Sequence, residues 1–156
     1  MKKTILITGA GTGIGKDAAF ALALRGHRVL ATTQTEAQSN ALMAESTQRN
    51  IVLEIFKLDI TQEADRESIS AYPIDVLINN AGMGESGSLA EVDMQRVRQI
   101  FEVNLFSTLA LTQVALRGMI ARERGSVLFV SSIAGRIPMP FLMPYSMSKF
   151  ALSAAG

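Results

Sequence analysis

Tyr145 and Lys149, a phenol and an ammonium four residues apart, form the pair in this sequence best suited to proton transfer. Residues at i and i+4 lie on one face of a helix, so the two side chains are expected to project together. Tyrosine is a poor base at neutral pH unless a neighbouring cation favours its phenolate. An ammonium about 5 Å away contributes on the order of 3 kcal/mol at an effective dielectric of about 20. The pair therefore predicts acid–base chemistry, although the same spacing is common on ordinary helix surfaces.

A second candidate for chemistry is the glycine-rich segment Thr8–Gly15, whose pattern is T-G-x-x-x-G-x-G. The pattern G-x-G-x-x-G fails because residue 14 is isoleucine, and a triphosphatase phosphate loop fails at Ala10 and Asp17. Glycines allow a tight turn and a close approach of backbone to a pyrophosphate, and a helix N-terminus attracts its charge. The alternative is a glycine-rich turn without a ligand. The residues expected to bind a dinucleotide here are Thr8, Gly9, Gly11, Thr12, Gly13, Ile14 and Gly15.

The end of the second predicted strand bears on the choice of cofactor. It reads Ala31–Thr35, with no arginine and no carboxylate before Glu36. A carboxylate there would bind the ribose 2′-hydroxyl and repel a 2′-phosphate, whereas hydroxyls such as Thr33 can donate to the phosphate. The sequence therefore favours NADP(H) over NAD. After the third strand, Asp59, with Ile60 beside it, is expected either to accept from the adenine amino group or to cap the next helix.

Short apolar runs alternate with longer amphipathic stretches, which predicts an α/β fold with a parallel sheet. The predicted strands are Thr4–Thr8, Arg28–Thr32, Ile51–Lys57, Val76–Asn79 and Ser126–Ser131. The predicted helices are Gly13–Arg25, Glu36–Gln48, Gln62–Ala71, Asp93–Arg122 and one from Tyr145 onward. We expect a doubly wound, Rossmann-like sheet with strand order 3-2-1-4-5. Ligands bind beyond the carboxyl ends of such strands, so the motifs that follow them should converge.

Composition narrows the class of protein. The chain has 156 residues, a formal charge of +1 and no basic run, so nothing points to nucleic acid or to an anionic membrane. It has no cysteine, which excludes disulfides and thiolate metal sites, and its one histidine, His27, is expected in a surface turn. The apolar start is too short for a signal peptide, and no stretch resembles a membrane span. We expect a soluble, cytoplasmic protein.

Taken together, the motifs resemble those of the classical short-chain dehydrogenase/reductase family. The resemblance covers the chain from residue 4 onward, and the motifs occur in the family's order and spacing. They are Thr8-Gly9-x-x-x-Gly13-x-Gly15, Asn79-Asn80-Ala81-Gly82, Val103-Asn104-Leu105, Ser131-Ser132-Ile133-Ala134-Gly135 and Tyr145-x-x-x-Lys149. The resemblance implies an oxidoreductase that moves hydride between NAD(P)(H) and a carbonyl or alcohol.

The same resemblance implies a role for each motif residue. Tyr145 is the general acid/base, and Ser132 hydrogen-bonds the substrate oxygen. Lys149 favours the phenolate and binds the nicotinamide ribose, while Asn104 holds a water that passes protons towards Lys149. The residues that support the sheet and the adenine-ribose side are Asn80, Ala81 and Gly82. Each also has a plainer structural alternative, such as a strand-end serine or a helix residue that bonds its own backbone.

The chain departs from the family's pattern at its end. It stops at Gly156, so the family's usual last two strands and substrate-binding lobe are absent from it. We expect one domain, residues 1–156, apparently truncated at the C-terminus, with the fifth strand as an open edge. Two explanations stay open: a piece of a longer protein, or a short product that is a non-catalytic dinucleotide-binding or scaffold protein.

Two segments are candidates for the substrate site. Arg136–Pro144 is apolar and stiffened by prolines, and in the resembling family this stretch borders the substrate pocket. It would suit an apolar ketone or alcohol, and a packed core loop is the alternative. Met83–Ser88 is expected at the same mouth. The long helix from Asp93 and the Tyr145 helix resemble those through which family members pair, so we expect a homodimer or homotetramer.

Overall fold

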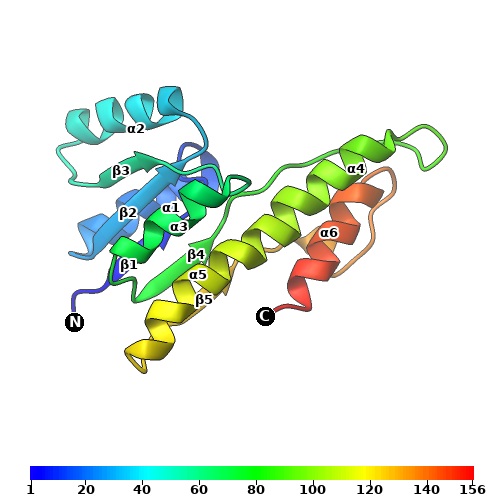
Figure 1. Ribbon diagram of the computed structural model, residues 1–156. Helices are drawn as coiled ribbons and strands as arrows, with labels where there is room; N and C mark the ends of the chain where they lie inside the picture. Colours follow the sequence, from blue (N-terminus) through cyan, green and yellow to red (C-terminus); the bar gives the residue numbers. More distant parts are fainter.

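The computed structural model describes all 156 residues and has a parallel sheet between two layers of helices (Figure 1). The strands are β1 (Thr4–Ile7), β2 (Arg28–Thr33), β3 (Glu54–Lys57), β4 (Val76–Asn79) and β5 (Ser126–Phe129). Every neighbouring pair is parallel, and the order is β3-β2-β1-β4-β5. The predicted fold class and strand order are confirmed. The chain adds β2 and β3 on one side of β1, and β4 and β5 on the other. Folds of this kind bind ligands where the strand order reverses, here between β1 and β4.

The helices are α1 (Gly13–Leu24), α2 (Glu36–Gln48), α3 (Glu63–Ser68), α4 (Met94–Phe101), α5 (Thr108–Ala121) and α6 (Met143–Ser153). The chain also has two short 3-10 turns, η1 (Ile69–Ala71) and η3 (Ile133–Gly135). A π-helical turn, η2, spans Glu102–Ser107. Because η2 joins α4 to α5 without a break, the chain from Met94 to Ala121 is one long helix. In Figure 1 this helix runs diagonally across the sheet, with α6 packed beside it.

Alternate residues of β1 fill two separate cores, as expected for a strand covered on both faces. Ile5 and Ile7 pack with Phe20 of α1 and Leu42 of α2. Leu6 faces the other way and packs in the cluster to which α5 contributes. All of these side chains are buried. The sheet is therefore fixed on both faces, and only the loops at its two ends are free to form a site.

The long helix Met94–Ala121 is long and apolar enough to cross a membrane, judged by length and composition alone. In this fold it lies along the sheet, and Asn104 and Leu111 on its inner side are fully buried. Its sequence also carries charged side chains, including Arg98 and Arg117. These features are those of a helix that covers the core.

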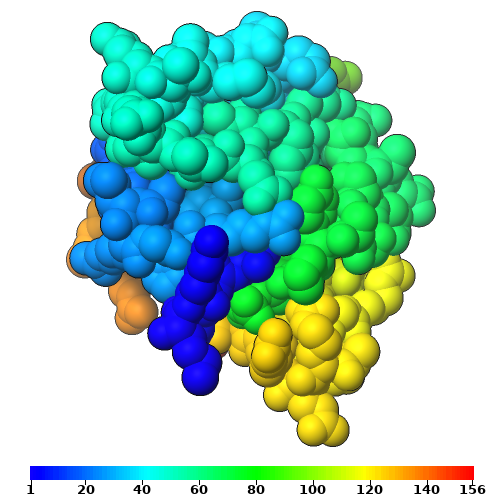
Figure 2. All heavy atoms as spheres, turned by 90° about the vertical axis from the view of Figure 1, so that its left-hand side faces the viewer, coloured from blue at the N-terminus to red at the C-terminus, as the bar shows by residue number.

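The amino ends of the strands lie on the side of the molecule seen in Figure 2. There the first residues project between α2 above and the end of α5 below, and Met1 is fully exposed. The glycine loop and the other candidate motifs follow the carboxyl ends of the strands, at the opposite edge of the sheet. The motifs are therefore expected to lie close together at that edge.

Two predicted boundaries differ from the structure in ways that matter, and one predicted helix is irregular inside. The third strand begins at Glu54 rather than Ile51, because pairing with β2 starts at the Leu30–Glu54 register. The predicted helix Asp93–Arg122 contains the π-helical turn. The last helix begins at Met143, before Tyr145, with Pro144 in its first turn, a position where proline costs nothing because its N–H would be unpaired anyway.

Candidate active site

The glycine loop and the segment after β4 are tied together by hydrogen bonds. The buried hydroxyl of Thr8 accepts from the backbone N–H groups of Asn80 and Ala81, both at 3.0 Å. In return, Asn80 Nδ2 donates to the carbonyl oxygens of Thr8, at 2.9 Å, and Gly9, at 3.0 Å. These bonds satisfy backbone groups that the turn leaves without a ladder partner. They fix the shape of the loop that opens α1.

Two glycines of the loop are required by close packing. Gly9 has φ +67, and a Cβ built on it would lie 2.9 Å from the Ala81 Cα. A Cβ on Gly15 would lie 2.6 Å from the Gly9 carbonyl oxygen. Gly13, with φ +55, has nothing within 4 Å of that position. The loop is thus packed tightly underneath and open above the start of α1. An open helix N-terminus behind a close-packed glycine turn fits the pyrophosphate of a dinucleotide.

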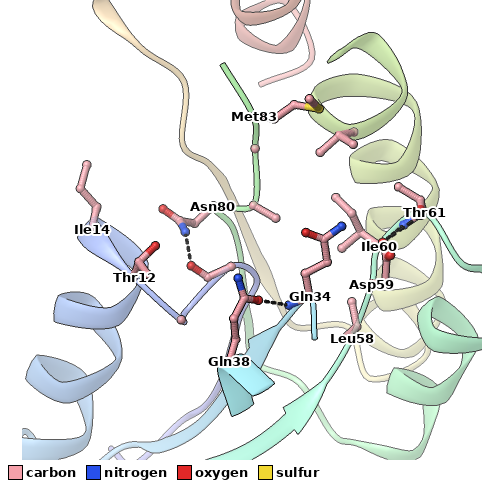
Figure 3. Close-up of a pocket in the computed structure, with 15 residues that line it drawn as sticks. Thr12, Ile14, Gln34, Gln38, Leu58, Asp59, Ile60, Thr61, Asn80 and Met83 are labelled. Atoms are coloured by element: carbon pink, nitrogen blue, oxygen red, sulfur yellow. Dashed lines mark hydrogen bonds between the residues drawn. The ribbon is translucent and has the colours of Figure 1, made fainter. Parts of the chain in front are cut away.

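A cavity of about 450 Å³ opens beside this loop and runs across the ends of β2, β3 and β4 (Figure 3). It is lined by Gly9, Gly11, Thr12, Ile14, Gln34, Gln38, Leu58, Asp59, Ile60, Thr61, Asn80, Ala81, Gly82, Met83 and Val103. Nine residues predicted to bind the cofactor lie in that wall: Gly9, Gly11, Thr12, Ile14, Asp59, Ile60, Asn80, Ala81 and Gly82. The structure therefore brings together loops that follow three different strands, and the cavity's shape and place suit a dinucleotide.

Thr33 is a correction to the sequence-based prediction. Its hydroxyl was expected to donate to a ribose phosphate, but the side chain is buried and does not line the cavity. The Oγ1 atom donates to the Thr35 carbonyl at 3.0 Å and lies 2.7 Å from the Ser39 hydroxyl. One bond stays in the turn between β2 and α2, and the other reaches the first turn of α2. The polar side chains that face the cavity from this turn belong to Gln34 and Gln38.

Asp59 lies in the cavity wall and does not cap a helix. Its Oδ1 accepts from the backbone N–H of Thr61 at 3.0 Å and from the Thr61 hydroxyl at 2.8 Å. The N-cap of α3 is Gln62, which makes no side-chain capping bond. The helix-cap alternative is therefore wrong, and the second carboxylate oxygen of Asp59 is the one without a protein partner.

Lys149 is buried near both the phenol ring of Tyr145 and Gly82 of the cavity wall. It is only 4 % exposed, and its Nζ donates to the Val130 carbonyl at 2.8 Å. Nζ is 5.8 Å from the centre of the Tyr145 ring, and a Cβ on Gly82 would lie 3.5 Å from it. Burial lowers the pKa of the Lys149 ammonium below its ordinary value, because the charged form loses its water. The predicted pair is assembled, and it adjoins the cavity at Gly82.

Asn104 is fully buried at the centre of the π-helical turn, and its side chain is committed to protein groups. Its Oδ1 accepts from Met83 N–H at 2.8 Å, while Nδ2 donates to the Met83 carbonyl and to Ser148 Oγ, both at 2.9 Å. Ser148 Oγ in turn donates to the Tyr145 carbonyl at 2.7 Å. A buried chain of hydrogen bonds therefore runs from the cavity wall at Met83 to the helix that carries Tyr145.

Ser132 follows β5 and opens the short turn η3. Its Oγ accepts from the Ala134 N–H at 3.1 Å, which is the local capping role expected of a strand-end serine. That bond uses an oxygen lone pair and leaves the hydroxyl hydrogen free to donate. The side chain is half-buried.

Comparison with known proteins gives a family. Residues 3–155 match the family model for short chain dehydrogenases. The chain belongs to the short-chain dehydrogenase family. It is 34% identical to the very-long-chain 3-oxoacyl-CoA reductase of Phaeosphaeria nodorum over 92% of its own length and 46% of that protein. It is 36% identical to the uncharacterized oxidoreductase YusZ of Bacillus subtilis, covering 97% of itself and 56% of YusZ.

Solved structures agree with this assignment. The NADPH complex of the F189W actinorhodin polyketide ketoreductase superposes with a TM-score of 0.93 at 27% identity, covering 99% of this chain and 62% of that one. A short-chain dehydrogenase from Streptomyces avermitilis matches at 30% identity with a TM-score of 0.89, over 99% of this chain and 58% of that chain. This short-chain dehydrogenase sequence thus spans about half to three fifths of the relatives' length.

The proline-rich segment of this short-chain dehydrogenase is a surface loop and not a packed core loop. Ile137 and Phe141 are 59% and 71% exposed. The Gly87 N–H donates to the Phe141 carbonyl at 2.7 Å, and Gly87 forms a bridge with Leu142. The two segments expected at one mouth, Met83–Ser88 and Arg136–Pro144, are therefore joined.

Several residues near the site escaped the sequence analysis, among them two whose hydrogen bonds shape it. Ser148 lies inside the Tyr-x-x-x-Lys motif, and nothing in its type distinguished it from other helix serines. Gln38 could have been found from the spacing Thr35-x-x-Gln38, which is the pattern of a capping box. The structure contains that box, and it turns the Gln38 side chain back over the end of β2.

Proposed function

We propose that this protein is an NAD(P)(H)-dependent oxidoreductase that transfers hydride between the cofactor and a carbonyl or alcohol, with Tyr145 as general acid/base. The observation that carries the proposal is the position of the Lys149 ammonium. It lies 5.8 Å from the Tyr145 ring centre, and a Cβ built on Gly82, in the cavity wall, would lie 3.5 Å from it. A dinucleotide cavity thus ends beside a phenol and a cation, which is the set of groups that hydride transfer to a carbonyl needs.

The residues of the cavity fit a dinucleotide in a definite direction. The glycine loop and the N-terminus of α1 would hold the pyrophosphate, and Asp59 beside Ile60 would face the adenine. Gly82 and Met83 lead towards Lys149, which would bind the nicotinamide ribose. When bound, the cofactor supplies or accepts the hydride. We favour NADP(H), because the cavity wall at the end of β2 contains no carboxylate.

The chain's own groups would handle the proton. In the direction of reduction, the Tyr145 hydroxyl gives its proton to the carbonyl oxygen, and in oxidation the phenolate takes it from the alcohol. Lys149 favours the phenolate by its charge, and the free hydroxyl hydrogen of Ser132 donates to the same substrate oxygen. The Asn104 side chain is committed to Met83 and Ser148, so a water that passes protons towards Lys149 would need partners other than that side chain.

The relatives' names support reduction of a ketone. A 3-oxoacyl-CoA reductase and a polyketide ketoreductase both act on oxo groups, by their names. In this chain the exposed apolar side chains of Ile137, Met139 and Phe141 suit an apolar ketone or alcohol. We also propose a homodimer or homotetramer that forms through the long helix and α6, in the cytoplasm, with no nucleic acid or membrane as partner.

A non-catalytic dinucleotide-binding or scaffold protein is the second candidate. The cavity and its glycine loop would serve such a protein equally well. It would bind the cofactor and turn over nothing.

The test follows NADPH absorbance with a panel of ketones and 3-oxoacyl thioesters, beside a titration of NADPH binding. We expect turnover with at least one apolar ketone, loss of that turnover in Tyr145→Phe, and unchanged NADPH affinity in the variant. Substantial activity in Tyr145→Phe would remove Tyr145 from its role. Binding without turnover across the panel would favour the second candidate, and no binding of either dinucleotide would contradict both.

A further inference from the structure

The carboxamide of Gln38 lies over the end of β2, where a Rossmann-like fold meets the adenosine ribose. Its Oε1 accepts from the backbone N–H groups of Gln34 at 3.1 Å and Thr35 at 3.2 Å. The Gln38 N–H donates to the Thr35 hydroxyl at 3.3 Å, which completes a capping box at the start of α2. The Gln38 side chain therefore lies where an NAD-binding protein of this fold has the carboxylate that binds the ribose 2′-hydroxyl, although Gln38 belongs to the helix that follows.

These bonds fix which end of the carboxamide faces the cavity. Two backbone donors hold the oxygen, and an amide nitrogen cannot accept from them, so the group cannot be turned round. The remaining atom, Nε2, is a pure donor, and no protein group accepts from it. Gln38 lines the cavity, and in Figure 3 its nitrogen points into it. A Cβ built on Gly11 would lie 3.8 Å from Gln38 Cδ, so the carboxamide lies next to the glycine loop.

No other polar side chain of this turn is both in the cavity wall and held in a fixed position. The Thr33 hydroxyl is buried and bonded within the turn, and the Thr35 hydroxyl accepts from Gln38. Glu36 is exposed and does not line the cavity. Gln34 lines the cavity, but no hydrogen bond fixes its side chain. Gln38 is the one side chain at the end of β2 that is both in the wall and held in place.

We propose that Gln38 is a specificity-determining residue, whose Nε2 donates to the 2′ substituent of the adenosine ribose and favours a 2′-phosphate. This rests on the proposed function, since it requires the cavity to bind a dinucleotide. A phosphate oxygen accepts a charge-assisted hydrogen bond, which is about twice as strong as the neutral bond that a 2′-hydroxyl accepts. A carboxylate in the same position would repel the phosphate and accept from the hydroxyl instead.

The test measures dissociation constants for NADPH and NADH by fluorescence titration of the chain and of Gln38→Glu. Glutamate keeps the capping acceptor, so the thermal midpoint is expected to be retained. We expect the unmodified chain to bind NADPH at least about tenfold more tightly than NADH. Gln38→Glu should weaken NADPH binding at least about tenfold and change NADH binding less than about threefold. The matched control is Gln48→Glu, the same charge change at the exposed far end of α2, and it should leave both constants unchanged.

A second measurement needs no variant. On the unmodified chain, 2′,5′-ADP should compete with NADPH at least about tenfold better than AMP, which lacks the 2′-phosphate. Equal competition by the two nucleotides would overturn the inference, as would a Gln38→Glu variant that loses both cofactors equally or neither. Either result leaves dinucleotide binding intact. Failure of the unmodified chain to bind any dinucleotide would instead overturn the proposed function, and this inference with it.

Discussion

Thr8 and Asn80, which are 72 residues apart in the sequence, hold each other by reciprocal hydrogen bonds. The Thr8 hydroxyl accepts from the Asn80 backbone, and the Asn80 side chain donates to the Thr8 carbonyl, at 3.0 and 2.9 Å. Through this contact the loop after β1 and the loop after β4 become one wall. The site depends on the hydrogen bonds between these two loops, and substitutions can test each of the residues involved.

Thr8→Val keeps the shape of the side chain and removes the acceptor of two backbone N–H groups. Each donor left unpaired away from water costs about 1–3 kcal/mol, so we expect the free energy of unfolding to fall by about 2–6 kcal/mol. NADPH affinity should fall as well. Thr8→Ser, which keeps the hydroxyl, should lose less than about 1 kcal/mol. Chemical denaturation measures both losses. A Thr8→Val variant as stable as the parent would contradict the claim that the Thr8 hydroxyl holds the two loops together.

Gly15→Ala tests the close packing beneath the loop. The added methyl group would meet the Gly9 carbonyl at 2.6 Å, and Asn80 also stands in its way. Overpacking of this kind costs about 1–3 kcal/mol, and the displaced loop should bind NADPH more weakly. Gly84→Ala is the matched control, because a Cβ there meets nothing within 4 Å. Equal unfolding free energies for the two variants would show that the loop has room to move.

Ser148→Ala interrupts the buried chain between Met83 and Tyr145. The Asn104 amide would lose an acceptor and the Tyr145 carbonyl a donor, so we expect a loss of about 1–3 kcal/mol in the free energy of unfolding. Ser153→Ala in the same helix removes an exposed hydroxyl that bonds the Lys149 carbonyl. It should cost less than about 1 kcal/mol. The reverse order of the two losses would contradict the assigned role of Ser148.

Lys149 should make stability depend on pH at the alkaline end. Burial lowers its pKa in the folded chain, so between that value and the ordinary value of 10.5 the unfolded chain binds more protons. Stability should therefore rise with pH through this window and reach its full value near pH 10.5. Below the pKa of Lys149 in the folded chain, the buried charge lowers the free energy of unfolding by a constant amount.

The measurement compares free energies of unfolding at neutral and alkaline pH for the parent chain and Lys149→Met. Relative to Lys149→Met, the parent should gain stability as the pH rises. A parent chain that loses stability relative to Lys149→Met over the same interval would mean that the ammonium is favoured by its surroundings.

The sequence predicted the sheet well because a strand buried on both faces leaves a continuous apolar run. It misplaced the start of β3 because Ile51–Leu53 are apolar without pairing, and pairing depends on the register with β2. It predicted the convergence of the motifs because the carboxyl ends of parallel strands meet at one edge. It also predicted the nearness of Tyr145 and Lys149, since i and i+4 share a helix face.

Side-chain direction in turns was beyond the sequence. Thr33 was expected in the site because it ends β2, but its hydroxyl is turned inward to Thr35 and Ser39. Gln38 was passed over because it lies in the helix that follows, and only the capping box brings its carboxamide back over the strand. The π-helical turn at Asn104 left no mark in the apolar pattern. Each miss depends on a hydrogen bond between residues that the pattern treats separately.

The most direct test of the account is a crystal structure of the chain with NADP⁺. We expect the pyrophosphate at the glycine loop above Gly13, the 2′-phosphate at Gln38, and the nicotinamide ribose within hydrogen-bonding distance of Lys149 Nζ, beside the Tyr145 hydroxyl. A dinucleotide bound with its nicotinamide away from Lys149 and Tyr145, or bound outside this cavity, would contradict the account.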